Sequence, residues 1–167
     1  MRDLRYGIEI EMTGLSRGKA AETLAGFFGT RAEHTGGGYD AYAVRDAQGR
    51  VWKLVSDGSI QTQKKVRGQT VAADSTYSVE LVSPVCVYED IGTIQEIVRA
   101  LRRNNALVND SCGIHVHVGA EKFDAQHLRN ITNIMASKEE LIYKALQVDL
   151  NRSQDYCRRV EQRFLRQ

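Results

Sequence analysis

The feature that most constrains this chain is an alternating segment near its N-terminus, residues 6–12. Apolar residues there alternate with glycine and glutamate, which is the period of a β-strand that has one apolar face. Glu9 and Glu11 therefore point to the same side of a sheet, roughly 6.6 Å apart along an extended strand. On its own, such a pair of like charges is most simply a face that is exposed to solvent.

Two later segments have the same construction, and this argues against solvent as the full explanation. In residues 77–82, Glu80 lies on the polar side of a predicted strand. In residues 110–119, His115 and His117 lie opposite an apolar side that we expect to be buried, formed by Ile114, Val116 and Val118. Because helices must cover the apolar sides of all three strands, their polar sides can line one common face. That face would carry Glu9, Glu11, Glu80, His115 and His117.

The rest of the chain predicts helices and a hairpin. Apolar residues have helical spacing in four segments, 20–28, 91–103, 125–145 and 152–167. Residues 41–44 and 51–55 flank a loop that contains a glycine, as in a β-hairpin. Residues 64–74 are polar and irregular, and we expect an exposed loop there. Asp57-Gly58 follows the hairpin directly, and such a pair by itself favours an ordinary turn over a functional role.

Composition restricts the class of protein. With 167 residues, 42% hydrophobic and 26% charged, the chain is expected to form a single globular domain over 1–167. A net charge of +2 is too small to indicate nucleic-acid binding. No apolar run is long enough for a membrane span, and the charged start does not resemble a signal peptide. Three distant cysteines without a CxxC motif fit a reducing compartment, so we expect a cytoplasmic protein that does not associate with membranes.

The common polar face predicts a metal site. Three carboxylates crowded together repel one another unless cations neutralise them. Carboxylates and water are the usual ligands of magnesium or manganese, and phosphate oxygens often complete a magnesium site. The face therefore indicates a divalent-metal site that holds a nucleotide. A zinc-dependent hydrolase is the alternative, because His115, His117 and Glu80 could supply a catalytic zinc site. Spacing alone does not choose between them.

Four segments in this order resemble the amidoligase family: Arg5 to Met12, Trp52 to Ile60, Val79 to Pro84 and Ser111 to Val118. That family belongs with glutamine synthetase and glutamate-cysteine ligase among the carboxylate-amine ligases. The resemblance covers essentially the whole chain. It implies an α+β fold of the glutamine synthetase catalytic type, a curved, mainly antiparallel sheet with metal and ATP on the concave face and helices on the convex face.

The resemblance also implies an activity and a set of roles. The activity is ATP-dependent formation of an amide bond through an acyl phosphate, with Mg²⁺ or Mn²⁺ as the ion and an amino acid, a peptide or a protein side chain as substrate. Glu9, Glu11, Glu80 and His115 match metal ligands, and His117 matches a histidine nearer the phosphates. Asp57 and Ser59 match the Asp-Gly-Ser motif that lines the site, Ser59 on the nucleotide side.

One departure concerns the C-terminus. Members of the family usually continue through a strand that carries a Glu-Phe-Arg type motif, whereas this chain ends at Gln167 inside a predicted helix. We therefore expect either a partial domain or a short form of the domain. In a short form, the arginine of that motif would be replaced by Arg152, by Arg158 or by an arginine from a second subunit. An unpaired sheet edge would favour association with another chain, such as a second copy. The departure also keeps open a non-catalytic, ligase-like binding module, with nucleic-acid binding by the last helix a weaker alternative.

Overall fold

The computed structural model describes residues 4–148, 150–154 and 157–160. The chain divides into two compact units, residues 1–119 and residues 120–167. The single domain expected from the sequence stays a prediction.

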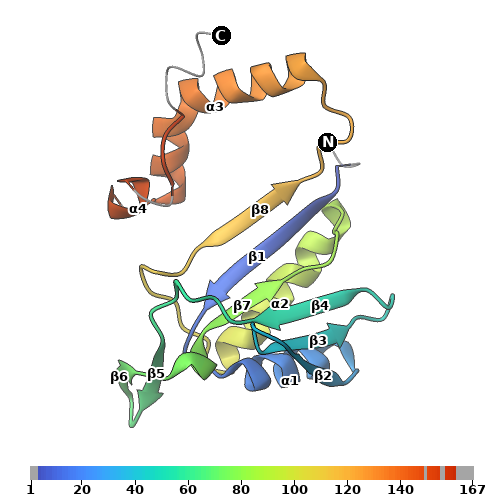
Figure 1. The fold of residues 1–167 in the computed structure, drawn as a ribbon, viewed down its shortest axis with the longest axis vertical. Helices are drawn as coiled ribbons and strands as arrows, with labels where there is room; N and C mark the ends of the chain where they lie inside the picture. The colour runs from blue at the N-terminus through green and yellow to red at the C-terminus, as the bar shows by residue number, and fades with distance from the viewer. Residues whose placement is uncertain (1–3, 149, 155–156, 161–167) are drawn as a thin grey trace. The chain divides into compact units, whose positions relative to one another are not determined.

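The first unit is built on a six-stranded sheet with the strand order β2-β3-β4-β7-β1-β8 (Figure 1). The strands are β1 (Tyr6–Met12), β2 (Ala32–Gly36), β3 (Ala41–Arg45), β4 (Val51–Val55), β7 (Val79–Val82) and β8 (Ile114–Val118). Every neighbouring pair is antiparallel. The α+β class and the mainly antiparallel sheet are therefore confirmed. The sheet is open and does not curl, so the curvature that the resemblance implied is not seen.

Two helices cover the apolar side of this sheet. They are α1 (Arg17–Phe28) and α2 (Ile91–Arg103), and the short 3₁₀ helices η1 (Ser75–Tyr77) and η2 (Tyr88–Asp90) lie in the connections. Ser16 begins α1 by accepting a hydrogen bond from the backbone N–H of Lys19. Gly29 ends it in the left-handed conformation at φ 67°.

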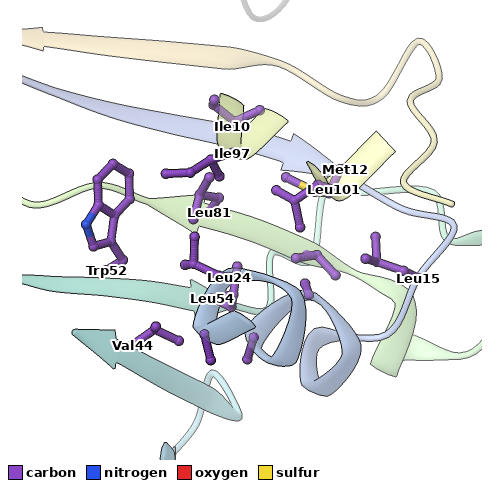
Figure 2. Packing of buried hydrophobic residues seen from close by; sticks show 14 of the residues in the cluster. Ile10, Met12, Leu15, Leu24, Val44, Trp52, Leu54, Leu81, Ile97 and Leu101 are labelled. Atoms are coloured by element: carbon purple, nitrogen blue, oxygen red, sulfur yellow. The ribbon is translucent and has the colours of Figure 1, made fainter. Parts of the chain in front are cut away.

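The buried core lies between α1, α2 and the central strands (Figure 2). Trp52 and Leu54 of β4 and Leu81 of β7 are fully buried there. The same cluster contains these further residues: Ile10, Met12, Leu24, Val44, Ile97 and Leu101. Because alternate residues of β1, β4 and β7 enter this core, the orientation of each strand is fixed, and the intervening side chains must lie on the opposite face.

The apolar side of β8 is not buried, which corrects an expectation from the sequence. Ile114, Val116 and Val118 are 64%, 59% and 51% exposed. The reason is that α1 packs against β2, β3 and β4, whereas no helix of the first unit makes comparable contacts with β8 at the edge of the sheet. The core cluster takes residues from β1, β3, β4 and β7, and none from β8, which the structure describes throughout.

Residues 64–74 form a hairpin and not the irregular loop expected from the sequence. Strands β5 (Gln63–Val66) and β6 (Gln69–Ala72) pair as a separate two-stranded sheet. Arg67 and Gly68 join them with φ of 50° and 83°, the two positive values that a type I′ turn requires. The segment escaped prediction because it has no apolar face, and β2 escaped for a similar reason.

The second unit contains α3 (Ala125–Leu146) and α4 (Leu150–Gln154). Asp124 caps α3 by accepting a hydrogen bond from the backbone N–H of His127. The sequence predicts a helix over 152–167. This prediction is wrong for residues 157–160, which are not helical. Its remaining part, 155–156 and 161–167, lies outside the described residues. No helix in the described parts of the chain is both long and apolar enough to cross a membrane.

Candidate functional site

The strand register brings the predicted acidic and histidine residues onto one face of the sheet. Glu11 of β1 lies directly opposite Glu80 of β7. On the other side of β1, Glu9 lies opposite His115, and Gly7 lies opposite His117. Residues that face each other across antiparallel strands point to the same side. All five predicted side chains therefore share one polar face, while their roles stay predictions.

Glu9 lies between the two histidines of β8. Its Oε2 is 3.1 Å from Nδ1 of His115 and 3.2 Å from Nε2 of His117. Burial alone would raise the pKa of Glu9, but hydrogen bonds to His117 and His115 overcome this effect and hold the pKa below its ordinary value. Glu9 is therefore ionised and oriented toward β8.

Glu11 is almost fully buried, with a side chain 5% exposed. Its Oε2 accepts a hydrogen bond of 2.6 Å from the backbone N–H of Gly113, just before β8. Its Oε1 lies 3.9 Å from Nε2 of His115. The backbone thus fixes one oxygen of Glu11 and leaves the other directed toward the cluster.

Glu80 lies near three other carboxylates on this face. Burial raises the pKa of its carboxyl group, and the charges of Glu9, Asp57 and Glu11 raise it further. Like charges directly opposite each other on neighbouring strands are destabilising. Glu80 and Glu11 occupy such positions, so this part of the sheet carries negative charge that the protein itself does not neutralise fully.

Asp57 joins this cluster from the turn after β4. Val55, the last residue of β4, lies opposite Glu80, and Asp57 follows two residues later. One Asp57 carboxylate oxygen accepts a hydrogen bond of 2.7 Å from the backbone N–H of Ser59. The turn that the Asp-Gly pair indicates is therefore real, and the same turn places Asp57 beside Glu80. Ser59 itself is exposed, and its role toward a nucleotide stays a prediction.

Two sets of side chains bring ligand atoms within 4.8 Å of one another. The first set is Glu9, Glu80 and His115, and the second is Glu11, Asp57 and Glu80. The second set offers only oxygen, which suits magnesium, and the first adds one imidazole, which manganese accepts. Both sets share Glu80. His117 belongs to neither set among the described residues, which weakens the alternative of a zinc site formed by His115, His117 and Glu80.

The structure also shows supporting residues that the sequence analysis missed. The Ser78 hydroxyl accepts a hydrogen bond of 2.9 Å from the Asp57 N–H and donates one of 2.6 Å to the Asp57 carbonyl. Arg17, which is 4% exposed, donates to the carbonyls of Ser78 and Ser75 at 2.8 Å and 2.5 Å. It also pairs with the Asp40 carboxylate. A buried arginine leaves no signal in a sequence, because the same residue type is usually exposed.

Lys53 of β4 was missed as well, although a signal for it existed. It lies between Trp52 and Leu54, both fully buried, so alternation alone directs its side chain to the polar face. That face is the one that carries Glu9 and Glu80.

Comparison with known proteins supports the resemblance. A family model described as "Putative amidoligase enzyme" matches residues 2–167. No curated protein and no solved structure gives a match. Since the family model covers nearly the whole chain, and the matching segments carry the polar face described above, the chain belongs to the amidoligase family.

Proposed function

We propose that this chain is an ATP-dependent and divalent-metal-dependent carboxylate-amine ligase with a catalytic sheet of the glutamine synthetase type. One observation carries the proposal, the two sets of closely spaced ligand atoms that share Glu80 in a chain of the amidoligase family. Two ions at one carboxylate-rich face are a common arrangement in enzymes that transfer phosphoryl groups.

In this proposal Glu9, Glu80 and His115 hold one ion, and Glu11, Asp57 and Glu80 hold the other. Mg²⁺ or Mn²⁺ bound there would supply positive charge to phosphate oxygens, where charge gathers during transfer. The protein's contribution is to hold its ligands in place before the ion arrives. The hydrogen bond from Gly113 to Glu11 does this.

The proposed reaction has two steps. A substrate carboxylate attacks the γ-phosphate of ATP, which breaks the bond to ADP and forms an acyl phosphate. An amine then attacks the acyl carbon, loses a proton and releases inorganic phosphate, which leaves the amide. No protein nucleophile is required, so the work of the chain is positioning and charge stabilisation. His117 and Ser59 are proposed to lie nearer the phosphates.

The substrate class is proposed from the family, as an amino acid, a peptide or a protein side chain. The sheet ends in the edge strands β2 and β8. An edge strand can pair with another chain, so association with a second copy through one of these edges is part of the proposal.

Trapping with hydroxylamine tests the chemistry directly, because this nucleophile converts an acyl phosphate to a stable hydroxamate. The chain is incubated with ATP, Mg²⁺ and hydroxylamine, together with a panel of free amino acids and short acidic peptides. We expect hydroxamate that requires both ATP and Mg²⁺ and is lost in Glu80→Gln.

The matched control is Glu96→Gln, which removes an exposed carboxylate of α2 that pairs only with Arg99 in the described structure. It should retain the product. A folded wild-type chain that gives no hydroxamate across the panel would contradict the acyl-phosphate mechanism.

A further inference from the structure

One row of facing residues crosses four strands of the sheet at the candidate site. Lys53 of β4 lies opposite Val82 of β7, Val82 lies opposite Glu9 of β1, and Glu9 lies opposite His115 of β8. Figure 1 shows these strands side by side in that order. Residues in such a row point to one side of the sheet, so Lys53 shares the polar face with Glu9 and His115.

The distance across this row is within reach of a lysine side chain. Neighbouring strands lie about 4.8 Å apart, so two spacings place the backbone of Lys53 about 10 Å from that of Glu9. Only the short side chain of Val82 lies between them in the row. A lysine has a flexible four-carbon stem that can carry its ammonium group over a neighbour of this size.

Lys53 also differs from two other cations of this unit, Arg17 and Arg50. Arg17 and Arg50 each pair with carboxylates, whereas Lys53 is exposed and makes no ion pair with another described residue. It is the only lysine or arginine in the sequences of β1, β4, β7 and β8. The buried neighbours Trp52 and Leu54 prevent the strand from turning it inward.

The charge balance indicates what Lys53 would bind. The two ligand sets contain four carboxylates, and two divalent ions would neutralise them. A triphosphate that enters this face brings additional negative charge, which needs a further cation. Lysine is a common phosphate ligand that acts as a point charge.

We propose that Lys53 binds the phosphoryl oxygens of the nucleotide on the polar face, beyond the predicted metal ligands. This inference rests on the proposed ligase function.

Calorimetric titration with a non-hydrolysable ATP analogue in saturating Mn²⁺ tests this role. The full chain is compared with Lys53→Met and Lys53→Arg, and Mn²⁺ binding is measured first for each protein. We expect Lys53→Met to bind Mn²⁺ as the wild type does, which also shows that the variant is folded, and to bind the nucleotide at least 10-fold more weakly. Lys53→Arg should recover most of the nucleotide affinity, because it retains the positive charge.

The matched control is Arg45→Gln. Arg45 lies on the same face but one strand further out, opposite Val51, and it should have no effect on nucleotide affinity. Equal nucleotide affinity in the wild type and Lys53→Met would overturn the role of Lys53 and leave the ligase proposal intact. A wild-type chain that binds Mn²⁺ but no nucleotide would overturn both.

Discussion

Two clusters of charged side chains in the first unit differ in how their charges are balanced. In the first, which we call the Arg50 cluster, Arg50 donates to Asp46 at 2.8 Å and to both oxygens of Asp90 at 2.8 Å and 2.9 Å. Asp46 also accepts a hydrogen bond from the indole of Trp52, and Asp90 accepts one from the backbone N–H of Val87. Burial opposes ionisation of Asp46, but these partners hold the pKa values of both aspartates below their ordinary range.

The second cluster is the one formed by the two ligand sets on the polar face, which we call the Glu80 cluster. There the pKa of Glu80 is raised and not lowered, because burial and three neighbouring carboxylates outweigh the attraction of His115. Both clusters contain buried carboxylates, so burial of a carboxylate does not by itself indicate a functional site. The Arg50 cluster satisfies its own charges, whereas the Glu80 cluster leaves negative charge that an external cation can neutralise.

The largest effect is expected when the Arg50 cluster is broken. Arg50→Met removes the cation that Asp46 and Asp90 share, and it leaves two poorly solvated carboxylates without a partner. The free energy of unfolding should fall by about 3–5 kcal/mol, as measured by urea denaturation. Mn²⁺ affinity should not change in the folded protein, and a loss in unfolding free energy below about 1 kcal/mol would show that this cluster is not structural.

Removal of the Glu80 charge should weaken metal binding and should not destabilise the metal-free protein. Glu80→Gln should weaken Mn²⁺ binding by on the order of 100-fold, because both ligand sets lose a member. The metal-free protein should become more stable by about 1 kcal/mol, because repulsion from Glu11 disappears. Thermal unfolding with Mn²⁺ and with EDTA measures both quantities. Glu96→Gln is the control, and a destabilised metal-free Glu80→Gln would contradict the excess of negative charge.

Loss of the Ser78 hydroxyl should have a smaller effect on the same cluster. Ser78→Ala leaves the backbone N–H and carbonyl of Asp57 without their partner, which costs about 1–2 kcal/mol in unfolding free energy. The Glu11, Asp57 and Glu80 set should then bind Mn²⁺ about 5-fold more weakly. Ser56→Ala is the matched control, because the Ser56 hydroxyl lies 3.5 Å from that of Ser78. Equal Mn²⁺ affinity in Ser78→Ala would mean that Asp57 is positioned by other contacts.

The smallest effect concerns the pH dependence of stability without metal. The pKa of Glu80 is raised in the folded state, so folding favours its protonated form. Stability from this group is present below the ordinary glutamate pKa and is lost as pH rises through the raised value. The pKa values of Asp46 and Asp90 are lowered, so their contribution is lost only as pH falls through those values.

Melting temperatures measured against pH in EDTA separate these contributions. Glu80→Gln should remove the decline at the higher pH and keep the decline in acid. In the wild type, Mn²⁺ should suppress the decline in melting temperature at the higher pH. A profile that is identical in the wild type and Glu80→Gln would contradict the raised pKa of Glu80.

The polar face could be predicted from the sequence because a strand repeats every two residues. Alternation in residues 6–12 and around Glu80 was sufficient to assign a common side, and the antiparallel register then set the neighbours. The hydrogen bonds from the Ser78 hydroxyl to the Asp57 carbonyl and from Arg17 to the Ser78 carbonyl could not be predicted, because they join segments far apart in the chain. The exposure of the apolar side of β8 reflects the lack of a helix of the first unit packed against that strand, which alternation does not reveal.

The stoichiometry of Mn²⁺ binding, measured by electron paramagnetic resonance, tests most directly whether the Glu80 cluster holds two cations that share Glu80. Two ions should bind to the wild type and one to Asp57→Asn, which disrupts only the set that contains Glu11. At the same Mn²⁺ concentration, Glu80→Gln should bind neither. A wild-type chain that binds no Mn²⁺, or an Asp57→Asn variant that still binds two ions, would contradict this account of the site.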